Sequence, residues 1–172
     1  MIFTTWIYGF FFVVTTTVYW TLPIGSAQVL GFHVPENFDY PYLQPNIARF
    51  WRSWHMSLTS WITDYVYIPL GGNRGGRVRT HVNRLVAMAL CGRWHGGAWH
   101  FVLWGIYHGI GLNVHRLYRD LRARLGISVD TGAFGRAAAT VLTFHFVCIG
   151  WVLFVLDAST ARAVIVRLLA LP

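Results

Sequence analysis

Three histidines and one arginine lie in a stretch that is otherwise aromatic, aliphatic and glycine, "RWHGGAWHFVLWGIYHG", residues 93–109. An ionisable group in apolar surroundings is costly, so an imidazole there is a candidate for function. A neutral imidazole, with an ordinary pKa of about 6.5, can take a proton from a hydroxyl as its oxygen attacks an acyl carbon. The stretch predicts a catalytic base in apolar surroundings. The alternative is a set of neutral histidines, each hydrogen-bonded in a core.

His95 is the strongest candidate for that base. Trp94 precedes it and Gly96 and Gly97 follow it, so a substrate can approach the ring without meeting a neighbouring side chain. A second polar ring could orient the first or donate to a developing oxyanion. His55 is one such ring, but the sequence leaves open whether the two meet.

The remaining histidines fall into two groups. Three are near the expected ends of apolar segments, where a histidine is usually solvated or bonded to a helix end: His33, His81 and His115. Three others lie within or beside apolar runs and have the same two interpretations as His95: His100, His108 and His145.

Other catalytic signatures are missing from the sequence. It contains no GxSxG elbow, Walker loop, HExxH or cysteine-rich metal motif, and we predict no metal site. The glycines of "GGNRGG" predict a turn, because the Lys-Ser/Thr of a phosphate loop is missing. Cys91 and Cys148 lie in apolar surroundings and are expected to be small core residues.

The composition predicts a membrane protein. Only 12% of the 172 residues are charged, about half the usual share for soluble domains. Three runs contain no Asp, Glu, Lys or Arg: 1–35, 94–115 and 137–156. Each is long enough for a helix of about 20 residues, which crosses a bilayer. The net charge of +8 is due to arginine, clustered at 74–84 and 116–124 between apolar runs. This pattern favours cytoplasmic loops of a membrane protein over a nucleic-acid surface.

We expect a single membrane domain over 1–172 with an all-α, polytopic fold. Residues 2–22 predict a first membrane helix; a signal peptide is disfavoured because the basic n-region is missing. Residues 47–70 predict one amphipathic helix at the membrane interface, with Trp51, Trp54 and Trp61 on one face. A further membrane helix is expected at 136–157, followed by a short or interfacial end.

Residues 82–116 are too long for one straight crossing, at about 50 Å. Paired glycines at 96–97 weaken a helix, so we predict a bent or re-entrant pair of short helices. This arrangement puts both arginine clusters on the cytoplasmic side and His95 near the apex.

Several longer motifs resemble the membrane-bound O-acyltransferase (MBOAT) family, in the branch of bacterial alginate O-acetyltransferases and their D-alanyl-transferring relatives. They are "PENFDYPYLQPNIARFWRSWHMSLTSWITDYVYIPLGGNRGG", "RWHGGAW", "LWGIYHG" and "LTFHFVCIGWVLFVLDASTARA". The match covers roughly residues 24–163, and its fixed aromatic positions make it specific.

The resemblance implies a many-helix membrane bundle with a tunnel, in which an acyl group moves from a cytoplasmic donor to a hydroxyl. The family's essential histidine falls on His95, and its second position, His or Asn, falls on His55. Positions in the same motifs predict substrate-binding residues at Trp54, Trp94, Asn73 and His108, of which His108 is the weaker candidate, with a structural alternative.

The resemblance also implies partners and a location. The expected donor is acetyl-CoA or another acyl donor, with no tightly bound cofactor. The acceptor is an exported polysaccharide such as alginate, or a periplasmic acyl-accepting partner protein. The expected location is the bacterial inner membrane, with several spans among membrane lipids and no nucleic-acid partner.

The chain departs from the family pattern in three ways. Family members are far longer, so it resembles a C-terminal half that would need an N-terminal half. An aspartate usual before "IG" is replaced within "TTTVYWTLPIG", and Arg93 stands where a small or apolar residue is usual. A non-catalytic membrane subunit or truncated remnant is therefore the alternative function. A histidine-lined channel is disfavoured, because no face carries paired charges.

Overall fold

The computed structural model describes residues 25–127, 132–157, 160, 163–164 and 166. The chain divides into two compact units, residues 1–36 and 37–172. In the first unit, residues 25–29 are helical and the chain is then irregular to residue 36. The predicted helix at 2–22 lies outside the described residues, as does most of the predicted C-terminal segment.

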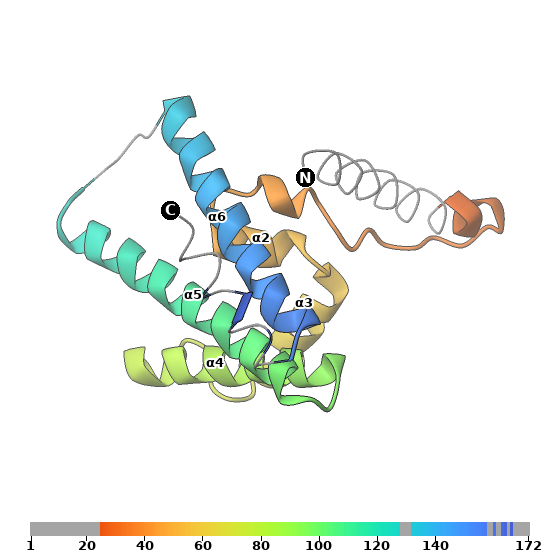
Figure 1. Cartoon of the computed structure of the whole chain (residues 1–172), viewed down its shortest axis with the longest axis horizontal. Coiled ribbons are helices and arrows are strands. Elements are labelled where there is room, and N and C mark those ends of the chain that lie inside the picture. Colours follow the sequence, from red (N-terminus) through yellow and green to blue (C-terminus); the bar gives the residue numbers. More distant parts are fainter. Residues whose placement is uncertain (1–24, 128–131, 158–159, 161–162, 165, 167–172) are drawn as a thin grey trace. The chain divides into compact units, whose positions relative to one another are not determined.

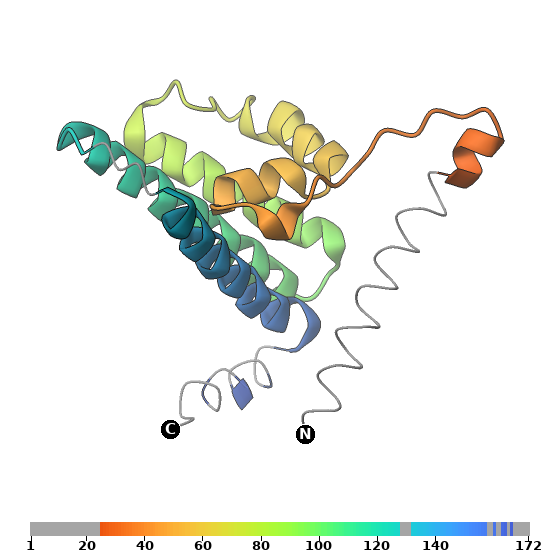
Figure 2. The ribbon, with the colours of Figure 1, turned by 90° about the horizontal axis from the view of Figure 1, so that it is seen from above.

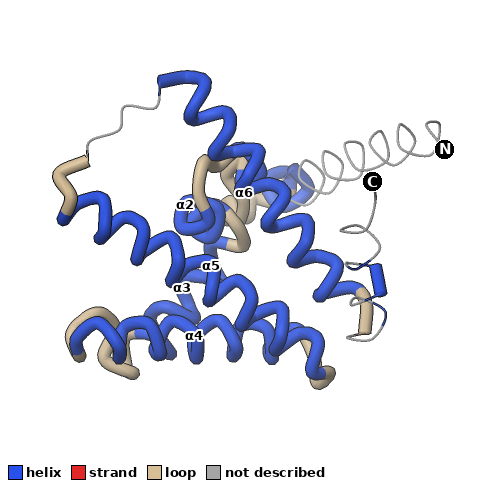
Figure 3. Tube along the Cα trace, turned by 60° about the vertical axis from the view of Figure 1, so that its left-hand side comes forward, coloured by secondary structure: helices blue, strands red, loops and turns tan. Residues whose placement is uncertain are grey.

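Every regular element in the described part of the second unit is helical, as the sequence predicts (Figure 1). The elements in chain order are η1 (Pro41–Leu43), α2 (Ile47–Ser53), α3 (Met56–Ile62), η2 (Thr63–Tyr67), α4 (Gly76–His95), α5 (Trp99–Arg124) and α6 (Gly132–Val155). Figure 3 shows helix and loop but no strand along the described trace. The all-α prediction is confirmed.

Helices α4 and α5 form an antiparallel hairpin, with the break at residues 96–98 (Figure 2). They approach closely because glycines line the contact: a Cβ on Gly92 would meet the Phe101 carbonyl, and one on Gly105 would meet the Met88 carbonyl. The break predicted at the paired glycines is confirmed. The helices are longer than expected, since α4 begins at Gly76.

Both arginine clusters lie at the same end of this hairpin. Asn113 of α5 joins the two helices there, because its Oδ1 accepts a hydrogen bond from Arg84 Nη1 at 2.7 Å. His81 Nδ1 lies 2.8 Å from the same oxygen, and Asn113 Nδ2 donates to the His81 carbonyl at 3.1 Å. The hairpin geometry predicted from 82–116 is thus observed.

The single helix predicted over 47–70 is wrong. The chain breaks at Trp54 and His55, because His55 has a left-handed backbone (φ 42°) that cannot continue a right-handed helix. The two short helices then turn different faces inward. Trp51 is buried in α2, whereas Trp61 in α3 is 51% exposed, so the predicted common tryptophan face does not exist.

Helix α6 packs against α5 and contributes Val147 to the core beside Phe50 and Trp104. Among the described residues, α6 is the one helix long and apolar enough to cross a membrane, with a mean hydropathy of 2.1. Its outward face carries large apolar side chains such as Phe134 and Leu142, together with the exposed Arg136 and His145. This agrees with the membrane span predicted at 136–157. A multi-pass arrangement stays a prediction.

Candidate functional site

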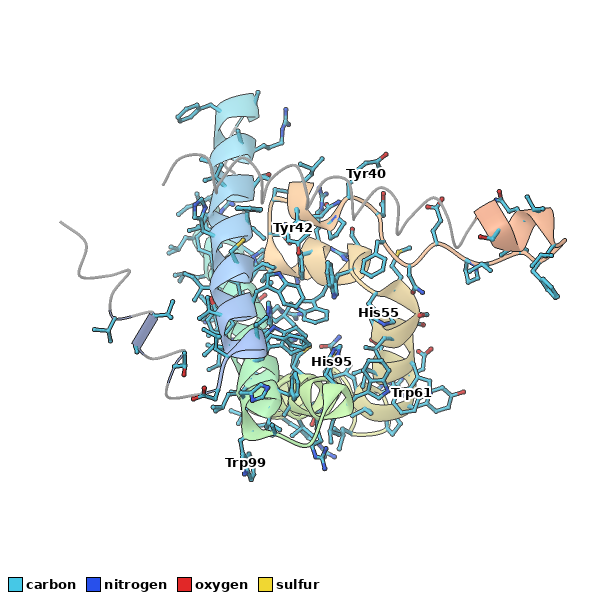
Figure 4. The ribbon with its side chains drawn as sticks, turned by 45° about the vertical axis from the view of Figure 1, so that its right-hand side comes forward. Tyr40, Tyr42, His55, Trp61, His95 and Trp99 are labelled. Carbon is cyan, nitrogen blue, oxygen red and sulfur yellow. The ribbon has the colours of Figure 1, made fainter. Side chains whose placement is uncertain are left out.

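The structure brings His55 and His95 into contact with the same ring, that of Trp94. The Trp94 ring lies 5.9 Å from the His55 ring and 4.9 Å from the His95 ring, both edge-to-face. His95 is the last residue of α4, and His55 lies in the turn before α3 (Figure 4). Two histidines 40 residues apart in sequence therefore meet through one aromatic ring.

Aromatic rings surround the His95 imidazole. Besides Trp94, it meets Trp104 of α5 at 5.3 Å and Phe154 of α6 at 5.1 Å, with interplanar angles of 90° and 84°. Edge-to-face packing of this kind is the favoured geometry for ring pairs. Within the described part of the chain, neither ring nitrogen of His95 has a hydrogen-bond partner. The ring is half-buried, so a reactant could reach it.

The His55 turn is held by the segment that precedes η1. The Met56 amide donates to the Asn37 carbonyl at 2.8 Å, and the Ser57 amide donates to Asn37 Oδ1 at 2.9 Å. Burial lowers the pKa of His55 from its ordinary value, so the ring is neutral at pH 7. Sequence reasoning missed Asn37, although its motif was among those that resembled the family.

The two predicted tryptophans take different positions. Trp94 is 58% exposed, which leaves one side of it open beside the two histidines. Trp54 is half-buried and stacks on Phe50 at 5.5 Å, with Trp151 of α6 at 5.2 Å. Trp54 thus belongs to the packing that supports the His55 turn.

His108 is separate from the histidine pair and fully buried. Its Nδ1 accepts a hydrogen bond from Trp51 Nε1 at 3.4 Å, which puts the proton on Nε2. Gly150 of α6 packs directly over that Nε2, which has no hydrogen-bond partner in the described structure. This environment agrees with the alternative interpretation that His108 is a structural residue. Its hydrogen bond with Trp51 joins α5 to α2.

Asn73 also lies away from the histidine pair. It is exposed in the loop before α4, and its Oδ1 accepts a hydrogen bond from Tyr67 Oη at 2.8 Å. It lines a cavity of about 430 Å³ between α2, α3, α4 and α5. The cavity reaches Thr59 and Cys91, each one helical turn from His55 or His95.

This cavity is basic. Arg52, Arg84 and Arg119 come to its wall from three different helices, and none of the residues that line it is acidic. Burial lowers the pKa of nearby His115, and the positive charges of Arg119 and Arg52 lower it further. The cavity therefore combines uncompensated positive charge at one end with an approach to the histidines at the other.

Arg93 closes the turn after His95. Its Nη1 donates to the Gly96 carbonyl at 3.1 Å, and the Gly96 amide donates to the Arg93 carbonyl at 3.3 Å. The residue that departs from the family pattern thus stabilises the backbone next to the histidine. The other departure, at 15–25, lies almost entirely outside the described residues.

The site combines groups suited to proton transfer. A neutral, half-buried imidazole can accept a proton, a second histidine lies across one ring, and a basic cavity approaches both. No group of three His, Cys, Asp or Glu side chains arranged to hold a metal ion is found among residues that the structure describes.

Comparison with known proteins gives consistent matches. Residues 1–156 match the family model for MBOAT, the membrane-bound O-acyltransferase family. Over 136 residues, the chain is 41% identical to the "Probable alginate O-acetylase AlgI" of Azotobacter vinelandii and 36% identical to the peptidoglycan O-acetyltransferase of Helicobacter pylori. It is 28% identical over 143 residues to the teichoic acid D-alanyltransferase of Bacillus subtilis.

These matches cover 79% of the chain in each case. They cover only 26%, 25% and 36% of the three relatives, so the chain spans about a quarter to a third of their length. The family model covers most of the chain, including both histidine motifs. The chain belongs to the membrane-bound O-acyltransferase family.

Proposed function

We propose that this chain provides the catalytic histidines of a membrane O-acyltransferase that transfers an acetyl group to hydroxyls of an exported polysaccharide. The observation that supports this most directly is the meeting of His55 and His95 around Trp94. Each histidine comes from a separate motif, and the fold brings them together beside an exposed ring. Among the described residues, no side-chain hydrogen bond is found for His95, whereas His108 accepts one from Trp51.

In the proposed reaction, neutral His95 takes the proton of the acceptor hydroxyl as that oxygen attacks the carbonyl carbon of a thioester donor. A C–O bond forms, and the collapse of the tetrahedral intermediate breaks the C–S bond. The imidazolium of His95 returns its proton to the leaving sulfur, which restores the base. His55 positions the acceptor or the donor at this carbon. The rings of Trp94, Trp104 and Phe154 around His95 would limit the approach of water, which would otherwise hydrolyse the donor.

The basic cavity is the proposed entry for the donor. Acetyl-CoA and carrier-bound acyl groups both contain phosphate, which arginine binds well through charge-assisted hydrogen bonds. Arg52, Arg84 and Arg119 would hold that phosphate, with Asn73 at the same wall. The acyl end would then extend past Cys91 toward His95, one turn away.

The names of the relatives support a proposal for the acceptor and the location. Their names refer to alginate, peptidoglycan and teichoic acid, all polymers outside the cytoplasm. We propose an exported polysaccharide such as alginate as acceptor, directly or through a periplasmic partner protein. We propose the bacterial inner membrane as location, with α6 as one of several spans. The relatives' greater length makes an N-terminal half a further proposed partner.

The direct test is His95→Gln in the full chain, produced in membranes of cells that export the polysaccharide. We expect polymer O-acetylation to fall about 10²- to 10⁴-fold, the usual contribution of a general base. His145→Gln is the control, because His145 is exposed on α6 and its Nδ1 bonds to the Val141 carbonyl at 2.7 Å, away from the histidine pair. Wild-type acetylation by the His95 variant would exclude the proposed role. A stable wild-type chain that transfers no acyl group would instead support the non-catalytic subunit.

A further inference from the structure

We propose that Asn37 is a positioning residue for His55: it caps α3 from outside the helix and so holds the imidazole opposite His95. The inference rests on the proposed function for its catalytic consequence. The geometric part, that Asn37 sets the position of the His55 ring, stands on contacts of the chain itself.

The first evidence is the way in which α3 is capped. A helix usually satisfies its first amides with the side chain of its N-cap residue. The N-cap residue of α3 is His55, whose side chain makes no such hydrogen bond. Asn37 provides the capping bonds instead. The Met56 amide donates to the backbone carbonyl of Asn37, and the Ser57 amide donates to the Asn37 side-chain Oδ1. His55 is thereby released from capping, and its ring packs against Trp94.

The second evidence is the backbone strain at His55. A left-handed conformation is unfavourable for a non-glycine residue, and it persists only where its surroundings impose it. The segment of Asn37 imposes it from both sides of the turn. Asn37 bonds to the residues after His55, while the Asp39 amide donates to the Ser53 carbonyl before it, at 2.9 Å. The ring of Phe38 lies between them, 5.9 Å from His55.

The chain offers a matched control for a merely structural cap. Asn46 caps α2 in the ordinary way, with its Oδ1 accepting a bond from the Arg49 amide at 2.9 Å. Asn37 and Asn46 are the same residue type, make side-chain cap bonds of equal length, and cap helices of seven residues each. They differ in position: Asn37 bonds to Met56 and Ser57, the two residues after His55, whereas Asn46 bonds to Arg49.

The activity test compares Asn37→Ala, Asn37→Asp and Asn46→Ala in the full chain. We expect Asn37→Ala to lower kcat about 10- to 100-fold, the effect of a displacement near 1 Å, with the donor KM within about twofold. Asn37→Asp keeps the oxygen acceptor and should recover most of the activity. Asn46→Ala should leave kcat within about twofold. Equal kcat in the Asn37→Ala and Asn46→Ala variants would overturn the inference.

A second measurement does not need catalysis. In the chain labelled with ¹³C at histidine Cε1 and placed in lipid nanodiscs, the His55 resonance is identified by its loss in His55→Gln. We expect Asn37→Ala to shift or broaden this resonance and Asn46→Ala to leave it unchanged. If Asn37→Ala does not reach the membrane, Asn37→Leu removes the same acceptor and keeps the number and branching of the side-chain heavy atoms. An unchanged His55 resonance in the Asn37 variant would overturn the inference.

The two measurements separate the failure of one proposal from the failure of the other. If His95→Gln retains wild-type acetylation, the proposed function fails, and the resonance still decides the role of Asn37. If His95→Gln is inactive while the Asn37 and Asn46 variants behave alike, the proposed function stands and the positioning role is wrong.

Discussion

At the scale of single residues, His55 combines two unusual features. Its backbone is left-handed, which it shares with only Tyr40 among described non-glycine residues, and its ring is half-buried against Trp94. Asparagine tolerates the left-handed conformation better than most residues. The resemblance to the family, in which this position is His or Asn, thus has a physical explanation in the turn itself.

This explanation predicts a difference between two variants of His55. His55→Asn should keep the free energy of unfolding close to wild type, because asparagine accepts the backbone conformation. His55→Ala should lose about 1 kcal/mol, the usual cost of a left-handed alanine. Chemical denaturation of the two proteins in the same detergent measures this difference. A larger loss for His55→Asn than for His55→Ala would contradict it.

The pH dependence of activity is a second prediction at this scale. Because burial lowers the pKa of His55, its neutral form prevails in the folded protein, and the unfolded chain takes up the proton at a higher pH. The stability due to neutral His55 is therefore present above about pH 6.5 and is lost as the pH falls. Protonation would also place a positive charge beside His95. We expect kcat to fall as the pH drops and His55 becomes protonated. His55→Asn should remove the contribution of this histidine to the acid limb of the pH profile. An acid limb unchanged in His55→Asn would contradict this.

At the scale of elements, the α4–α5 hairpin positions the catalytic candidate. His95 ends α4, and the return of the chain brings Trp104 against its ring. Trp104 also contacts Trp51 of α2 and Trp151 of α6, so one fully buried ring connects four helices at the site. The distance between α4 and α5 must be small for these contacts, and glycines set that distance.

The hairpin predicts that Gly105→Ala is destabilising. A Cβ there meets backbone of α4 at Met88, which cannot rotate away as a side chain can. We expect a loss of about 1–3 kcal/mol in the free energy of unfolding, typical of overpacking. Gly97→Ala is the control, because the nearest atom to its Cβ would be Arg93 Nη1 at 3.8 Å. Equal stability of the two variants would show that the helices are not held this close.

At the scale of the whole second unit, the hairpin puts both arginine clusters at one end, and Arg84 and Arg119, one from each cluster, line the basic cavity there. In a membrane, positively charged ends favour the cytoplasmic side. The donor is cytoplasmic in the proposed reaction, so charge, cavity and donor would share one side. The histidines then lie about one helical turn deeper than the cavity.

Topology can be tested by cysteine labelling. In a chain with alanine at both native cysteines, Arg79→Cys and Arg119→Cys should react with a membrane-impermeant maleimide from the same side. The antiparallel hairpin requires this, whatever the orientation of the protein. Labelling of the two positions from opposite sides would contradict the hairpin as the membrane arrangement.

The cavity makes a separate prediction about donor binding. Arg52→Gln should raise the KM for the donor about tenfold, which corresponds to one lost charge-assisted hydrogen bond of about 1.4 kcal/mol, with a small effect on kcat. Arg49→Gln is the matched control, because Arg49 is exposed on the same helix and is not among the residues that line the cavity. Initial rates at varied donor concentration measure both constants. The same KM in both variants would assign the phosphate to another surface.

The sequence by itself determined the helical class, the break between residues 82 and 116, and His95 as the main candidate. These features depend on local properties: hydrophobic periodicity, the flexibility of paired glycines and the cost of an imidazole among apolar residues. It did not predict the break of 47–70, because the apolar spacing of those residues suits a continuous helix. The turn at His55 is imposed by Asn37, which lies in another segment.

Only the tertiary structure decided which candidates meet. It joined His55 to His95 through Trp94, placed His108 in the core beside Trp51, and left Asn73 at the basic cavity. These are contacts between residues far apart in the chain, and they depend on how closely glycine-lined helices pack. The spacing of motifs gives the order of residues along the chain. It does not give the distance between the helices on which these residues lie.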